Sequence, residues 1–105
     1  MSEPAGVGDS ARKAAAPIVR ELEICNKKGL HARASAKFVQ IVEKYDAEVK
    51  VKRGHETVGG TSIMGLMMLA AGPGSTITVE ATGAQAAEVV EALARLVSGR
   101  FTEQE

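Results

Sequence analysis

The sequence predicts an α+β domain with the element order βαββαβα and a largely antiparallel sheet. Apolar and polar residues alternate in the segments that read as strands, and the spacing changes to a helical period between them. Three of the connections are too short to hold a helical crossover, so much of the sheet should be antiparallel, with the helices covering one face. A chain of 105 residues is long enough for one such domain and too short for two.

The first strand and the first helix are predicted at residues 18–24 and 31–45. Ile18, Leu22 and Ile24 share one parity in the strand, while glutamates take the other, which is typical of a half-buried strand. In the helical segment the apolar residues fall on one arc and most charged residues on the other. A loop at residues 26–29 joins the two elements.

The remaining elements are shorter and are separated by turns that contain glycine or proline. They are a second strand around Val49 and Val51, a weak third strand at 56–59, a short apolar segment at 63–69, a fourth strand at 76–81 with Ile77 and Val79 inward, and a last helix at 84–97 that Gly83 opens.

The N-terminal segment differs in composition from the rest. Residues 1–16 are rich in alanine, glycine and serine and show no apolar periodicity, so we expect a disordered tail before a domain at 17–105. The formal net charge is zero, which gives no overall field toward nucleic acid or an anionic membrane. No apolar run approaches the roughly 20 residues of a membrane span, and the N-terminus lacks a secretory signal pattern.

Cys25 is the only cysteine, so neither an intramolecular disulfide nor a metal site made of cysteines can form. A lone thiol fits a reducing compartment, and we expect the cytoplasm. There is no glycine loop of the nucleotide-binding type and no acidic metal cluster. We therefore expect no cofactor, no metal and no independent enzyme activity. His55 is read as a solvated turn residue, and Arg20, Arg53 and Arg100 as surface charges.

His31 lies where the first loop meets the first helix, in the segment Gly-Leu-His-Ala-Arg. The first N–H groups of a helix lack intrahelical acceptors and, with the macrodipole, form a site for an anion. Imidazole is a nucleophile at neutral pH, and Arg33 adds a planar donor fork suited to phosphate oxygens. His31 is therefore either a phosphoryl acceptor or a capping histidine beside a surface arginine, and the residues alone favour neither.

Ser62 precedes an uncharged helical segment and is a good N-cap candidate. Phosphate is tolerated at a helix N-terminus, so phosphorylation is a second interpretation, although the capping role is favoured by the residues alone. On a helical wheel Leu66 and Leu69 face the core. The opposite side is predicted to form an exposed apolar patch for partner proteins, made of Ile63, Met64 and Met67.

Together these two segments resemble the HPr family, the histidine-containing phosphocarriers of the bacterial phosphotransferase system. Residues 29–33 look like the family's phosphorylation motif, and residues 61–67 look like its regulatory-serine segment. The likeness extends over about residues 17–99. Ala34 replaces a proline that many members have, and residues 26–28 are similar to the nitrogen-related branch, whereas the Ser62 segment looks like regulated HPr.

The resemblance implies an open-faced β-sandwich, with three helices on one face of a four-stranded antiparallel sheet. It implies that enzyme I, which uses phosphoenolpyruvate, phosphorylates His31, that Arg33 stabilises the phosphate, and that an EIIA-type protein accepts it. HPr kinase/phosphorylase would modify Ser62, and Ile63, Met64 and Met67 would dock partners. A monomer is expected, with no nucleic-acid or membrane partner.

Other functions are compatible with this topology. An RNA-binding βαββαβ module stacks bases on strand aromatics, but the predicted strands contain none. A small-molecule regulatory domain with a structural His31 is a second alternative. A regulatory protein-interaction domain of the same fold, which acts mainly through its phosphorylation state, is a third.

Overall fold

The computed structural model describes residues 17–103, so the predicted tail at 1–16 lies outside the described residues, as do residues 104–105. The predicted element order is confirmed, and an additional 3₁₀ turn follows the last helix. The elements are β1 (Ile18–Glu23), α2 (Ala32–Glu43), β2 (Glu48–Arg53), β3 (Glu56–Gly59), α3 (Ile63–Met68), β4 (Thr76–Thr82), α4 (Ala86–Ser98) and η1 (Arg100–Thr102).

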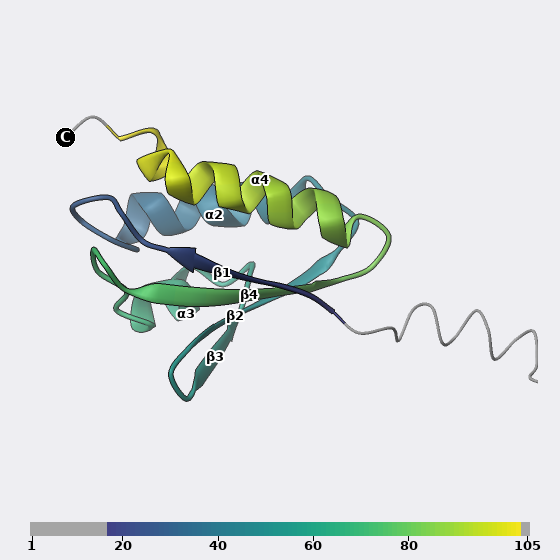
Figure 1. Cartoon of the computed structure of the whole chain (residues 1–105), viewed down its shortest axis with the longest axis horizontal. Coiled ribbons are helices and arrows are strands. Elements are labelled where there is room, and N and C mark those ends of the chain that lie inside the picture. Colours follow the sequence, from purple (N-terminus) through teal and green to yellow (C-terminus); the bar gives the residue numbers. More distant parts are fainter. Residues whose placement is uncertain (1–16, 104–105) are drawn as a thin grey trace, which may run out of the picture.

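The four strands form one sheet in the order β1-β4-β2-β3, and every neighbouring pair is antiparallel. The central register places Val51 opposite Val79 on one side and Val58 on the other. Helices α2 and α4 lie side by side over the sheet, while α3 packs against α2 and β3 (Figure 1). This is the open-faced sandwich that the resemblance implied.

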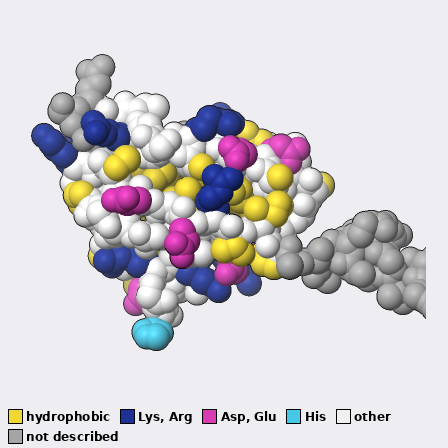
Figure 2. Space-filling view, in the orientation of Figure 1, with side chains coloured by type: hydrophobic (Ala, Val, Ile, Leu, Met, Phe, Trp, Pro, Cys, Tyr) yellow, Lys and Arg dark blue, Asp and Glu magenta, His cyan; other side chains and the backbone are white. Residues whose placement is uncertain are grey.

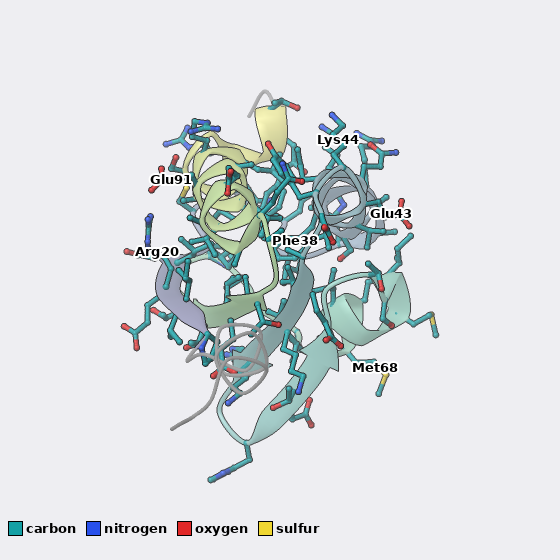
Figure 3. The ribbon with its side chains drawn as sticks, turned by 90° about the vertical axis from the view of Figure 1, so that its right-hand side faces the viewer. Arg20, Phe38, Glu43, Lys44, Met68 and Glu91 are labelled. Atoms are coloured by element: carbon teal, nitrogen blue, oxygen red, sulfur yellow. The ribbon has the colours of Figure 1, made fainter. Side chains whose placement is uncertain are left out.

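The core lies between the helices and the inward-facing residues of the strands. Strand β4 alternates strictly, with buried residues at Ile77, Val79 and Ala81. Phe38 of α2 is fully buried and points into the space between helices and sheet (Figure 3). Burial of this apolar face, worth roughly 25 cal/mol per Å², stabilises helices that are too short to persist alone.

The bounds of helices α2 and α4 differ from the prediction. Helix α2 begins at Ala32, one residue after His31, and ends at Glu43. Helix α4 begins at Ala86 and not at residue 84, because Gln85 binds the turn after α2. Its side-chain Oε1 accepts the N–H of Asp46 at 2.7 Å, and its own N–H donates to the Asp46 carbonyl at 2.9 Å. These tertiary contacts hold Gln85 in a non-helical conformation, so the helix begins two residues later than predicted.

Two arginines that were expected to be only solvated have protein partners. Arg20 donates from Nη2 to Oε2 of Glu91 at 2.6 Å and so connects β1 with α4 (Figure 3). Arg53 donates from Nη1 to the carbonyl of Leu69 at 3.0 Å. Leu69 is the C-cap of α3, where carbonyl groups lack intrahelical donors.

On the face shown in Figure 2, basic and acidic side chains are interspersed, with apolar groups between them. This face therefore lacks the single-signed basic stripe that nucleic-acid binding requires. None of the helices within residues 17–103 is long and apolar enough to cross a membrane.

Candidate functional site

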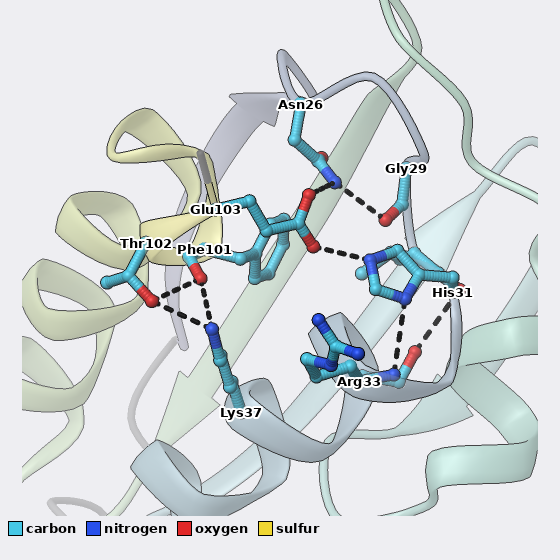
Figure 4. Close-up of polar contacts among 10 residues, drawn as sticks. Asn26, Gly29, His31, Arg33, Lys37, Phe101, Thr102 and Glu103 are labelled. Carbon is cyan, nitrogen blue, oxygen red and sulfur yellow. Dashed lines mark hydrogen bonds and ion pairs between the residues drawn. The ribbon is translucent and has the colours of Figure 1, made fainter. Parts of the chain in front are cut away.

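His31 is the N-cap of α2, as the sequence predicted. Its backbone is extended, with φ −75° and ψ −177°, and its carbonyl accepts the first helical hydrogen bond from Ser35 at 2.9 Å. The ring nitrogen Nδ1 accepts the N–H of Arg33 at 3.3 Å (Figure 4). Nδ1 thus faces the positive end of the helix, where an attached anion would meet further N–H groups.

The loop before His31 depends on Gly29. This residue has φ +63°, and a Cβ there would lie 2.2 Å from the carbonyl oxygen of Ala71. Leu30 then donates its N–H to that same oxygen at 3.0 Å, and the N–H of His31 donates to the Gly29 carbonyl at 2.9 Å. Only glycine allows this close approach, which positions the histidine at the helix start.

Cations surround the histidine in a cleft of about 270 Å³ at the N-terminal end of α2. Arg33 lies in this cleft, as predicted, on the same side of the helix as Lys37 (Figure 4). The arginine provides the planar fork and the lysines provide point charges for phosphate oxygens. The cleft is lined by Lys27, Lys28, His31, Arg33, Lys37, Thr102 and Glu103.

Glu103, from the end of the described chain, is a part of this site that the sequence analysis missed. The carboxylate Oε2 forms a hydrogen bond with Nε2 of His31, and Oε1 accepts from Nδ2 of Asn26 at 3.0 Å (Figure 4). Asn26 is fully buried and also donates to the Gly29 carbonyl at 3.0 Å. One asparagine therefore links the histidine loop to the C-terminal segment.

The C-terminal segment is held in place by Phe101 and Lys37. The Phe101 ring is fully buried in the core, although it follows the last helix. Lys37 donates from Nζ to the carbonyl of Phe101 at 2.6 Å and to Oγ1 of Thr102 at 2.7 Å. Lys37 is half-buried, and these contacts connect helix α2 with the C-terminal segment. The one sequence signal for this anchor is the apolar residue Phe101 within an otherwise polar segment after the last helix.

Burial by itself would raise the pKa of the Glu103 carboxyl, but other interactions outweigh it. Hydrogen bonds from Asn26 and His31, with the charges of His31 and Lys37, hold this pKa below its ordinary value of 4.5. Glu103 is therefore a carboxylate at neutral pH. A carboxylate only accepts hydrogen bonds, so the ring hydrogen of neutral His31 lies on Nε2 and Nδ1 keeps its lone pair.

Ser62 is the N-cap of α3, in agreement with the capping interpretation. Its Oγ accepts the N–H of Gly65 at 2.9 Å, and its carbonyl accepts that of Leu66 at 2.9 Å. Gly65 is needed for close packing, because a Cβ there would lie 2.9 Å from both Ser62 Oγ and the Cβ of Val58. The Ser62 side chain is exposed.

The predicted apolar patch on α3 is exposed. Leu66 and Leu69 are buried, as the helical wheel indicated, and the opposite side faces solvent. Met68, which the sequence analysis did not assign, points away from the molecule and is 71% exposed (Figure 3). The exposed side chains of this patch are Ile63, Met64, Met67 and Met68.

Other candidates remain apart from this site. His55 is exposed beside Gly54 in the β2–β3 turn, consistent with the solvated role expected for it. Cys25 is an exposed free thiol that lies after β1 and donates to the Val97 carbonyl at 3.3 Å. Within residues 17–103 there is no group of three or more His, Cys, Asp or Glu that could hold a metal ion.

Comparison with known proteins identifies the class. A family model described as the PTS HPr component phosphorylation site matches residues 18–99. Phosphocarrier protein HPr of Cupriavidus necator is 49% identical over 88 residues, covering 84% of this chain and 99% of that protein. Phosphocarrier protein NPr of Shewanella violacea is 39% identical over 86 residues, covering 82% of this chain and 94% of that protein.

Solved structures agree with the sequence relatives. HPr-C-His from Thermoanaerobacter tengcongensis superposes with a TM-score of 0.79 at 35% identity, covering 84% of this chain and 99% of that one. HPr from Bacillus anthracis superposes with a TM-score of 0.74 at 40% identity, covering 78% of this chain and 98% of that one. The fold and the matched segment thus define a small carrier protein of the phosphotransferase type. The chain belongs to the HPr family of phosphocarrier proteins.

Proposed function

We propose that His31 accepts a phosphoryl group at Nδ1 from enzyme I, which draws it from phosphoenolpyruvate, and passes it to an EIIA-type protein. The observation that carries this proposal is the position of Nδ1. It keeps its lone pair, lies at the N-terminus of α2 and opens onto a cleft with Arg33 and three lysines. The site of action is the cytoplasm, and the carrier acts as a monomer.

The transfer needs no cofactor. The Nδ1 lone pair forms the N–P bond while the bond from phosphorus to the donor breaks, and the donor takes that electron pair. The N–H groups at the helix start and the Arg33 fork stabilise the phosphoryl oxygens. The same groups serve the acceptor reaction, so the phosphoryl group remains transferable in both directions.

The apolar patch on α3 supports the relay role. Both the donor and the acceptor must bring their reacting groups to His31, and α3 packs directly against the helix that His31 caps. Ile63, Met64 and Met67 are therefore proposed to contact these partners. Methionine side chains adapt to surfaces of different shape, which suits a carrier that binds more than one protein.

A regulatory role is proposed for Ser62 as the target of HPr kinase/phosphorylase. The hydroxyl is exposed at the start of α3, where the helix dipole tolerates a phosphate. The phosphate would place a dianion beside the apolar patch and so weaken the docking of apolar or acidic partners. Phosphorylation of Ser62 is expected to slow transfer to His31.

The test is an intact-mass measurement after incubation with enzyme I and phosphoenolpyruvate. The wild-type chain should gain one acid-labile phosphoryl group, and His31→Ala should gain none. His55→Ala is the matched control, since it removes the other described histidine and should leave the adduct unchanged. An absent adduct on the wild type, or one retained in His31→Ala, would reject the proposal and favour a regulatory interaction domain.

A further inference from the structure

The two nitrogens of the His31 ring have partners of opposite character. Nδ1 accepts a hydrogen bond from the Arg33 backbone, while Nε2 donates to the Glu103 carboxylate on the other edge of the ring (Figure 4). The carboxylate therefore lies away from the nitrogen proposed to carry the phosphoryl group. Its side chain is only 12% exposed, compared with 26% for the histidine.

We propose that Glu103 is a positioning residue for phosphoryl transfer, which holds the hydrogen of His31 on Nε2 and stabilises the positive charge that the ring gains when Nδ1 is phosphorylated. This inference rests on the proposed function of His31. A carboxylate that orients a histidine through its second nitrogen fixes the tautomer and raises the basicity of the first.

The step balances in atoms and charge. As the Nδ1 lone pair forms the N–P bond, the bond to the donor breaks and its electron pair leaves with the donor. The hydrogen stays on Nε2, so the ring becomes an imidazolium, and the Glu103 carboxylate faces this new charge. On transfer to the acceptor, the electron pair of the N–P bond returns to Nδ1, and a neutral imidazole with its hydrogen on Nε2 leaves.

The position of Glu103 is determined by several contacts and not by the histidine alone. Residues Arg100, Phe101 and Thr102 have φ between 55° and 60°, a left-handed conformation that is unfavourable for residues with a side chain. Burial of Phe101 and the two hydrogen bonds from Lys37 maintain this turn. Such a strained turn, anchored in the core, is what delivers the carboxylate to the cleft.

Asn26 makes the contact specific for a carboxylate. Its Nδ2 donates both to the Gly29 carbonyl and to Oε1 of Glu103, so a side chain at position 103 must present an acceptor to Asn26. A glutamine there has one acceptor and one donor group. With its oxygen on Asn26, its NH₂ group would face Nε2 and favour the tautomer with hydrogen on Nδ1, which has no lone pair for phosphorus.

The experiment compares wild type, Glu103→Ala and Glu103→Gln for the initial rate of phosphoryl uptake from enzyme I and phosphoenolpyruvate. Glu103→Ala should be slower by about ten-fold, because one charge-assisted hydrogen bond is lost. Glu103→Gln should be slower still, because it selects the wrong tautomer. Glu88→Gln, which removes one exposed carboxylate from α4, is the matched control and should keep the wild-type rate.

The ring tautomer is measured independently from the ¹⁵N shifts of Nδ1 and Nε2 in alkaline solution. Hydrogen should be on Nε2 in the wild type and mainly on Nδ1 in Glu103→Gln. A wild-type rate or tautomer in Glu103→Gln, or faster uptake in Glu103→Ala, would overturn the inference. Failure of the wild type to take up phosphoryl would instead reject the function of His31, and the two failures are therefore distinguishable.

Discussion

Two helices of this molecule begin with a side chain that caps its own helix, yet their surroundings differ completely. At α2 the cap is the His31 ring, with a hydrogen bond of 3.3 Å, and the cleft around it contains four cations and one carboxylate. At α3 the cap is the Ser62 hydroxyl, with a hydrogen bond of 2.9 Å, followed by a helix without acidic or basic residues. The same local geometry thus presents a ring nitrogen in a cationic cleft in one place and a hydroxyl beside an exposed apolar patch in the other.

A helix start is therefore not a functional site by itself. Both starts offer N–H groups to an anion, but of these two only α2 has a ring nitrogen with a lone pair, an arginine in the same cleft, and the Glu103 carboxylate bound to the second ring nitrogen. The α3 start offers a hydroxyl and apolar neighbours. Its proposed phosphorylation would act on docking and not on the transfer chemistry.

The largest expected effect comes from exchanging the His31 ring for another cap. Asparagine is among the best N-cap residues, so His31→Asn should keep the free energy of unfolding within about 1 kcal/mol of wild type. Phosphoryl uptake should nevertheless be lost completely, because no imidazole nucleophile remains. Intact-mass and urea-unfolding measurements on the same sample check both parts, and a retained acid-labile adduct would contradict the assignment.

Arg33 should give the next largest effect. Arg33→Ala removes a charge-assisted hydrogen-bond donor from the cleft and is expected to slow phosphoryl uptake by about 10- to 100-fold. Arg33→Lys keeps the charge without the planar fork, so its rate of uptake should fall between those of wild type and Arg33→Ala. Initial rates at saturating enzyme I are the measurement. Equal rates in all three proteins would show that the arginine is an ordinary surface residue.

A negative charge at the start of α3 should slow phosphoryl uptake less than the loss of Arg33 does. Ser62→Asp keeps a good N-cap and places a carboxylate beside the apolar patch, so uptake should slow by about five-fold through weaker docking. The effect should appear in KM for the carrier more than in kcat. Thr61→Asp is a neighbouring control that adds the same charge outside the cap. An unchanged KM in Ser62→Asp would argue against regulation at this position.

Ser62→Ala separates the capping role from the regulatory one. Loss of the cap should lower the free energy of unfolding by about 1 kcal/mol, measured by urea denaturation. The rate of phosphoryl uptake should stay at the wild-type value, since the hydroxyl does not contact the His31 cleft. A slowed uptake in this variant would mean that the two helix starts are coupled through the fold itself.

The smallest expected effect is a pH dependence of stability at Glu103. Because the folded-state pKa of this carboxyl is lowered, its contribution is present above its ordinary value of 4.5 and is lost as the pH falls through the folded value. The difference in free energy of unfolding between wild type and Glu103→Ala should therefore shrink below about pH 4.5. Urea unfolding at several pH values tests this, and a difference that stays constant in acid would contradict the hydrogen bond to His31.

The sequence predicted much of this molecule because its signals are local. Alternation around Val49, Val51, Ile77 and Val79 placed the strands, and the wheel of residues 63–69 separated buried Leu66 from exposed Met64. His31 was located at the start of α2 from its neighbours alone. Errors arose where distant segments interact, as where Gln85 binds Asp46 and delays the start of α4.

Periodicity and short motifs are enough to predict the order of elements, the antiparallel sheet, the family and the histidine at a helix start. How the His31 ring is held depends instead on contacts between distant parts of the chain. Glu103 lies 72 positions away in the chain, and no local pattern brings it to the ring. The burial of Phe101 and the hydrogen bonds of Lys37 and Asn26 do so, because the core fixes where the end of α4 lies relative to the start of α2.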